Sequence, residues 1–205
     1  MGLNNWLQGR WDPLDQKEFS LRIHRAHGLY NKARYHRLKA QALFETREKK
    51  NVIVAIGLLL KSIKEFVVEE EMHSTYSLLC DCYLFLEDKN KALLFLKEGL
   101  EKNVYGLATS FSSLVIEEKK ENEFSFATQV MKDAYENKRL ISPRDLFFYH
   151  CLMALYFEKI DALRAKEDAH MALSYARMKN SGLEVDSLWE FVVPKQWIMR
   201  KLKKI

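Results

Sequence analysis

The clearest hydrophobic pattern in the chain lies between His73 and Gly106. Two apolar segments of helical length flank a polar break at 87–90. Each segment repeats its apolar residues at steps of three and four, the spacing of one face of an α-helix. The pattern predicts an antiparallel helical hairpin, and one hairpin is too small to bury that face alone. The periodic positions are Tyr76, Leu79, Cys80 and Tyr83 in the first segment, and Ala92, Leu93, Leu96 and Leu100 in the second.

Three further parts of the chain repeat this pattern. Aligned on Ala55, Ala92, Ala127 and Ala165, neighbouring copies are offset by 37, 35 and 38 residues. A series of such copies predicts an all-α chain, an α-solenoid of about four stacked hairpins. The hairpins are expected at about 32–70, 73–106, 108–140 and 146–179, within a repeat domain at 15–182, with breaks near 49–51, 87–90, 117–123 and 159–161.

The two ends of the chain depart from the repeat. Residues 1–14 are expected to form an irregular arm, and Asp12-Pro13 is a turn or helix-start signal. Trp6 and Trp11 either pack over the open end of the repeats or serve as an anchor for a partner. Helical periodicity from about 15 to 27 predicts an N-terminal capping helix. Residues 183–205 predict C-terminal capping helices at 185–192 and 194–205.

The central hairpin resembles the tetratricopeptide repeat family. That family places a Trp three residues before Leu-Gly, then a Tyr, and an Ala-x3-Phe step in the second helix. Here the corresponding residues are Tyr76, Leu79-Cys80, Tyr83, Ala92 and Leu96, and Gly99 stands at a further small position. The resemblance implies a right-handed superhelix in which the first helix of each hairpin lines a concave groove.

The resemblance also implies a binding surface for a peptide or a helix. Aromatic side chains among small polar residues suit such a ligand, because large rigid side chains dominate binding energy. The basic groove positions favour acidic partners. The family's clamp for acidic C-terminal tails is disfavoured, since its aligned positions hold Ala40, Phe44, Thr109 and Ser113. The predicted groove residues are Arg37, Phe44, Arg47, Ser77, Asp81, Phe85, Ser112, Lys119, Lys120, Phe147, His150 and Phe157.

The net charge of +5 is unevenly distributed. Residues 19–44 contain six Lys or Arg and no acid, whereas residues 65–123 contain thirteen acids and six bases. A basic stretch at the first helices is either a solvated outer face or a site for nucleic acid or another acidic ligand. The alternative function is therefore a nucleic-acid-associated or peptide-sensing regulatory protein. The stretch comprises Arg22, Arg25, Lys32, Arg34, Arg37 and Lys39.

The sequence offers little that indicates catalysis. It has no glycine-rich phosphate loop and no Gly-x-Ser-x-Gly elbow, so we expect neither an enzyme nor a cofactor. His24, His27 and His36 lie close together, but their surroundings are basic and we expect no metal site. Three cysteines without metal-ligand spacing fit a reducing, cytoplasmic location. No apolar run is long enough to span a membrane. We therefore predict a cytoplasmic adaptor, chaperone or regulatory subunit, with homodimerisation through an end of the array left open.

Overall fold

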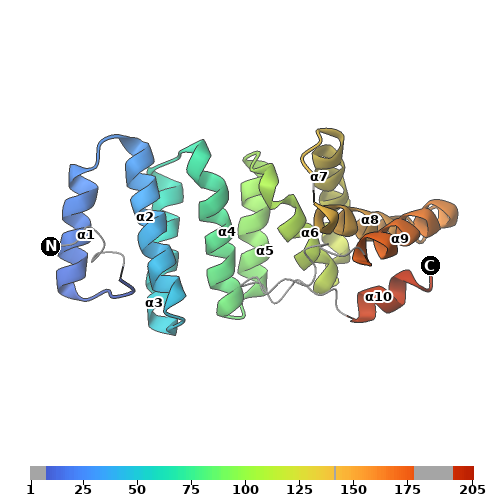
Figure 1. The fold of residues 1–205 in the computed structure, drawn as a ribbon, viewed down its shortest axis with the longest axis horizontal. Coiled ribbons are helices and arrows are strands. Elements are labelled where there is room, and N and C mark those ends of the chain that lie inside the picture. The colour runs from blue at the N-terminus through green and yellow to red at the C-terminus, as the bar shows by residue number, and fades with distance from the viewer. Residues whose placement is uncertain (1–7, 141, 178–195) are drawn as a thin grey trace. The chain divides into compact units, whose positions relative to one another are not determined.

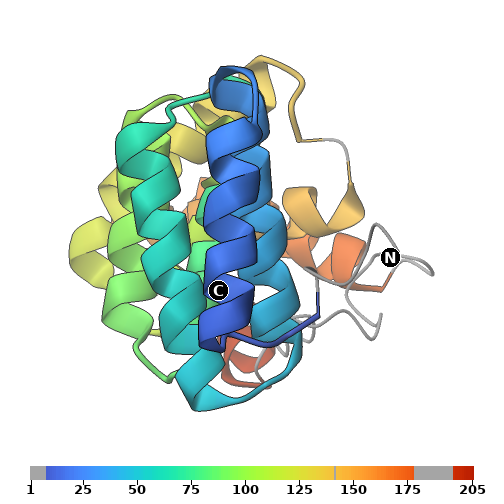
Figure 2. The ribbon, with the colours of Figure 1, turned by 90° about the vertical axis from the view of Figure 1, so that its left-hand side faces the viewer.

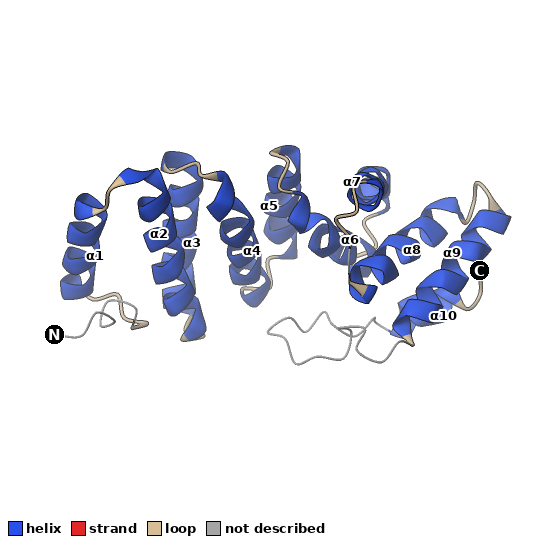
Figure 3. Cartoon of the chain, turned by 45° about the horizontal axis from the view of Figure 1, so that its top comes forward, coloured by secondary structure: helices blue, strands red, loops and turns tan. Residues whose placement is uncertain are grey.

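The computed structural model describes residues 8–140, 142–177 and 196–205. Within these residues the chain is all-helical, with no strand (Figures 1 and 3). The predicted capping helix at 185–192 lies outside the described residues. The elements are α1 (Pro13–Arg25), α2 (Gly28–Glu45), α3 (Lys49–Glu65), α4 (Glu69–Phe85), α5 (Lys89–Glu101), the 3-10 helix η2 (Tyr105–Leu107), α6 (Ala108–Glu117), the 3-10 helix η3 (Glu121–Glu123), α7 (Phe124–Glu136), α8 (Pro143–Phe157), α9 (Ala162–Ala176) and α10 (Gln196–Leu202).

The helices form two compact units. Unit 1 comprises residues 1–104 and unit 2 comprises residues 105–205. In unit 1, α2 packs against α3, α3 against α4 and α4 against α5, and α2 also contacts α4. Figure 2 views unit 1 with α1 nearest the reader. The core of this unit is formed by apolar side chains with at most 1% exposure, such as Leu43, Leu59, Tyr76 and Leu79.

In unit 2, too, helices that follow one another in the chain pack together. Here α6 packs against α7, α7 against α8 and α8 against α9, while α6 also contacts α8. The C-terminal helix α10 packs against both α8 and α9. Its Ile198 and Leu202 are almost completely buried, as an apolar stripe on a capping helix requires. Lys201 of α10 forms an ion pair with Glu158 at the end of α8.

Side-chain caps begin several of the helices. Asp12 accepts hydrogen bonds from the backbone N–H groups of Leu14 and Asp15, and Pro13 takes the first helical position of α1. Asp12-Pro13 is therefore a helix start, two residues before the expected one. Ser142 and Asp145 form a reciprocal capping box at the start of α8. These caps satisfy N–H groups that have no partner within the helix.

Left-handed residues end many of the helices. A non-glycine residue with φ between 53° and 64° follows α2, α4, α5, α6 and α7. After four of these helices, the N–H of the next residue bonds a carbonyl five positions back, as in the bond from Asp88 to Tyr83. This Schellman-type end satisfies the last carbonyls and reverses the chain within a few residues. The residues concerned are Arg47, Glu87, Asn103, Lys119 and Lys138.

The break predicted in the first hairpin at 49–51 is wrong. The chain leaves the helix at 46–48, and Lys49 already begins α3. The two lysines indicated a loop because they are charged, but both are exposed on the first turn of the helix. Asn51 instead turns inward and is buried. The other breaks lie at 86–88, at 118–123 with η3, and at 158–161.

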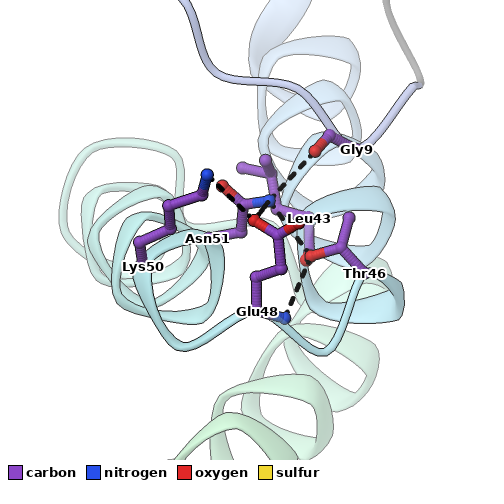
Figure 4. A network of polar contacts seen from close by, with 6 residues as sticks. All are labelled: Gly9, Leu43, Thr46, Glu48, Lys50 and Asn51. Carbon is purple, nitrogen blue, oxygen red and sulfur yellow. Dashed lines mark hydrogen bonds and ion pairs between the residues drawn. The ribbon is translucent and has the colours of Figure 1, made fainter.

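The described part of the N-terminal arm packs against α1, α2 and α3. Asn51 of α3 donates a hydrogen bond of 3.0 Å to the carbonyl of Gly9 (Figure 4). Lys39 of α2 donates one of 3.0 Å to the carbonyl of Gln8. The ring of Trp11 packs edge-on against Phe19 of α1. Of the two alternatives for Trp11, packing against the first helices is the one present; Trp6 lies outside the described residues.

Candidate functional site

The first two helices assigned to the groove, α2 and α4, meet in unit 1. Arg37, in the middle of α2, forms an ion pair of 2.5 Å with Glu71 in the first turn of α4. Near their C-terminal ends, the rings of Phe44 and Phe85 stand edge-on with centroids 6.1 Å apart. These two contacts fix the register of the pair. The predicted groove residues of unit 1 therefore lie on neighbouring helices, with Ser77 on α4 between the two contacts.

An arginine covers the aromatic end of this surface. The guanidinium carbon of Arg47 lies 4.2 Å from the ring centroid of Phe44 and 5.7 Å from that of Phe85. A planar guanidinium stacked on rings is held in place while its N–H edge remains available to a carboxylate. Arg47 is exposed and Phe85 is half-buried, whereas Phe44, also predicted as a groove residue, is buried with 6% exposure. We call Phe44, Arg47, Asp81 and Phe85 the α2–α4 cluster.

Asp81 is the unusual member of the α2–α4 cluster. It lies one helical turn before Phe85 and is only partly exposed. Burial raises the pKa of its carboxyl group to about 8, and Arg47 opposes this rise. In the described part of the chain, no group donates a hydrogen bond to Asp81. A neutral carboxylic acid can both donate and accept a hydrogen bond, so Asp81 offers both to a ligand.

The predicted groove of unit 2 is partly wrong. Phe147 and Ser112 are completely buried and cannot contact a partner in this structure. His150 faces the second helix of its own hairpin: its Nδ1 lies 2.8 Å from a carboxylate oxygen of Asp168, and its ring stacks on Tyr175. The physical reason is that α8 is covered by α6, α7, α9 and α10, so it has no open face along most of its length.

Other predicted residues of unit 2 remain at the surface. Phe157 is half-buried at the end of α8, and the guanidinium of Arg164 stacks 4.0 Å from its ring centroid. Lys119 is exposed and Lys120 is half-buried at the end of α6. A hydrogen bond of 2.8 Å from Thr109 to Asp145 joins the first helices of the two hairpins.

The predicted basic patch is smaller than the sequence suggested. Arg22 pairs with Glu18 at 3.0 Å, and Arg37 pairs with Glu71. Lys39 is only 1% exposed, so it is not part of a basic surface. Arg25 and Arg34 are exposed and Lys32 is half-buried. Two intramolecular ion pairs and one buried lysine lower the charge available to a phosphate backbone.

A polar network that the sequence did not reveal lies under the α3–α4 connection. Tyr76 donates a hydrogen bond of 3.0 Å to Glu98, and Lys102 donates bonds of 2.9 Å to the Tyr76 hydroxyl and 2.6 Å to Glu98. The hydrogen bond from Lys102 lowers the pKa of Glu98. The network borders a mostly apolar cavity of about 80 Å³ that Phe66 and Met72 also line. Only the i, i+4 spacing of Glu98 and Lys102 was visible in the sequence.

Chemistry-bearing residues do not gather elsewhere in the described residues. No group of three or more His, Cys, Asp or Glu side chains there has the arrangement of a metal site. The three cysteines are free and buried, and burial raises the pKa of the Cys80 and Cys151 thiols. A buried neutral thiol is a poor nucleophile. In the described parts of the chain, no helix is both long and apolar enough to cross a membrane.

Comparisons with known proteins add no relative. No protein-family model, curated protein or solved structure matches the chain. The α2–α4 cluster therefore has to be interpreted from its own geometry.

Proposed function

We propose that this chain is a tetratricopeptide-like helical-repeat protein that acts as a protein-interaction module in the cytosol. Within each unit, the first helices of successive hairpins contact each other, α2 with α4 and α6 with α8. This pattern supports stacked repeats, since each hairpin buries its apolar face against the next. Three free, buried cysteines fit a reducing compartment.

The α2–α4 cluster is the surface that we assign to the partner. The observation that carries the proposal is the stacking of Arg47 over Phe44 and Phe85 beside Asp81. Aromatic and arginine side chains dominate the energetics of protein interfaces, and polar groups without a partner gain most from a ligand. The cluster lies on two adjacent helices, which suits a peptide or a helix laid across their C-terminal ends.

One of the two groove cations predicted in unit 1 is already paired within the chain. Glu71 neutralises Arg37, so Arg47 is the groove cation of unit 1 that remains for an acidic group. Because a pKa of about 8 keeps Asp81 largely neutral at pH 7, it does not cancel Arg47. An acidic partner therefore remains the expectation, now based on one stacked arginine.

A matched pair of variants tests this function. Phe85→Ala removes a ring from the cluster, whereas Phe95→Ala removes a similarly half-buried ring that stacks on Tyr83. Tyr83 lies two residues from both Asp81 and Phe85, and hence on the other side of α4. Both variants and the native chain would be used for affinity purification from native lysate, with and without nuclease, followed by direct binding of each recovered protein.

The expected result is a protein that survives nuclease treatment, binds the native chain and the Phe95→Ala chain equally, and binds the Phe85→Ala chain at least about tenfold more weakly, a loss of about 1.4 kcal/mol. Equal loss in both variants would show that the cluster is not the interface. If the recovered partners are lost after nuclease treatment, the binding surface is instead the basic stretch of the first helices.

A further inference from the structure

At the end of the α2–α3 hairpin, two buried side chains bind the main chain of a bent segment, Gln8–Trp11, in which the N–H of Arg10 also bonds the carbonyl of Gln8 at 2.7 Å. The carbonyls of Gln8 and Gly9 accept hydrogen bonds of 3.0 Å from Lys39 and from Asn51. Both donors are buried, with 1% and 6% exposure. Asn51 is itself held by Thr46 at 3.1 Å and by Glu48 at 3.4 Å, so its amide is oriented before the segment arrives (Figure 4).

The site also selects side chains along the segment. A Cβ atom added to Gly9 would lie 2.0 Å from Cγ2 of Thr46 and 2.8 Å from the backbone oxygen of Ala42. Because the second of these atoms belongs to a helix backbone, only glycine fits at this position. Two residues later, the Trp11 ring packs against Phe19 and lies 5.7 Å from the Lys39 ammonium. The segment is therefore recognised by two carbonyls, one glycine and one aromatic ring.

The polar side chains buried at this site favour a segment that can dissociate from it. A permanently covered surface is best served by apolar side chains, because burying a lysine carries a desolvation cost. Burial lowers the pKa of Lys39, and the nearby carboxylates of Asp15, Glu18 and Asp12 oppose this effect. When the segment departs, Lys39 and Asn51 regain water, which makes the open state accessible.

Helix α1 is only lightly attached to the rest of unit 1. Phe19 is the single buried residue of α1. Only two residues separate α1 from α2, and α2 begins at Gly28, which has a φ of 77° and open space around it. Glycine adopts this conformation without steric cost, so the connection can serve as a hinge. An open pocket of about 400 Å³ beside the segment, lined in part by Trp11 and Val54, leaves room for a bulkier occupant.

We propose that this end of the α2–α3 hairpin is a second peptide-binding site, which the chain's own Gln8–Trp11 segment fills in the free protein. Its external ligand is a partner segment of the same pattern, a stretch that bends at a glycine and carries an aromatic side chain two residues later. That ligand enters after α1 and the segment swing away at Gly28, and because Phe19 leaves with α1, the ligand's aromatic side chain meets the Lys39 ammonium that Trp11 faces in the free protein. This site is independent of the α2–α4 cluster and of the function proposed for it.

The test uses the full chain and a synthetic peptide covering residues 8–15. Gly9→Ala in the chain prevents docking of its own segment, whereas Gly9→Ala in the peptide gives a matched control ligand. Binding is followed by chemical-shift changes at Thr46 and at the Asn51 side-chain amide, with peptide up to millimolar concentration. A tethered segment competes at roughly millimolar effective concentration. We therefore expect the peptide to bind the Gly9→Ala chain at least about tenfold more tightly than the native chain, about 1.4 kcal/mol.

Two further comparisons decide the site. Asn51→Leu added to the Gly9→Ala chain should weaken peptide binding about tenfold, again about 1.4 kcal/mol, and the alanine peptide should not bind. If Gly9→Ala does not fold, Trp11→Ala releases the segment with a smaller disturbance. Equal affinity of the native and variant chains, equal binding of the alanine peptide, or no shift at millimolar peptide would overturn the proposal. A native dimer that the peptide dissociates would also overturn it, because the occupant would then be a second copy.

Discussion

Helices α4 and α8 were predicted to play the same part, one in each unit, and they differ in how much of their surface is covered. On α4, Asp81 and Phe85 stay partly exposed beside Arg47. On α8, Phe147 is fully buried and His150 is bound to Asp168 of the next helix. Both helices begin a hairpin, so their place in the repeat is the same. Their neighbours differ, and those neighbours decide which face can bind a ligand.

The sequence contains a trace of this difference. The middle of α8, from Leu146 to Tyr156, is apolar except for His150, whereas α4 carries Ser74, Ser77 and Asp81 along one face. A helix that is apolar all round is a buried helix. The alignment with the repeat pattern did not use this signal, because it assigned groove positions only from the place of each residue in the repeat.

The largest expected effect contrasts the two aromatic residues. Phe147→Ala should lower the free energy of unfolding by about 3–5 kcal/mol, since it leaves a cavity in a fully packed site. Phe85→Ala should lower it by only about 1 kcal/mol, because the ring is half-buried and its space is open to water. Urea denaturation of both variants measures the difference. Equal losses would contradict the contrast between α4 and α8.

Asp81 makes unit 1 sensitive to pH. Its pKa is about 8 in the folded chain and 3.8 in a model compound, so between these values the folded state retains a proton that the unfolded state has lost. The contribution of Asp81 to stability is therefore complete below about pH 4 and falls as pH rises to about 8, by at most about 1.4 kcal/mol per pH unit. The facing charged group is Arg47, and the thiols of Cys80 and Cys82 lie on the same helix.

Asp81→Asn removes this titration. We expect the variant to become progressively more stable than the native chain from pH 4 to pH 8, and the difference to stay constant above that range. Denaturation curves at closely spaced pH values would show it. Parallel pH profiles for the two proteins would mean that the Asp81 carboxyl group is better solvated than its position indicates.

The smallest effect concerns a feature that the two units share. Glu87 in unit 1 and Lys119 in unit 2 have φ values of 61° and 53°. Glycine at either position should raise the free energy of unfolding by about 1 kcal/mol, because it relieves the steric cost of the left-handed conformation. Lys132→Gly, at an exposed position within α7, should lower it by about 1 kcal/mol. A gain in one unit alone would show that the helix ends are not equivalent.

Much of the architecture was predictable because local rules govern it. Apolar periodicity located the helices, and Asp12-Pro13 and Ser142-Pro143 marked the starts of α1 and α8. Lys49 to Asn51 misled the prediction because charge alone does not distinguish a loop from an exposed first turn. Within the candidate site, the resemblance to the tetratricopeptide repeat assigned Phe44, Arg47, Asp81 and Phe85 to one groove, but it gave no measure of their exposure.

The sequence by itself determined the helical class of this protein, the approximate position of its hairpins and the identity of the residues on each helix face. Those properties follow from interactions between residues a few positions apart, which a linear pattern records. Tertiary structure alone decided that Glu71 neutralises Arg37, that Lys39 and Asn51 hold the backbone of Gln8 and Gly9, and that α8 is enclosed. Burial and pairing depend on side chains distant in sequence, so they are fixed only when the helices pack.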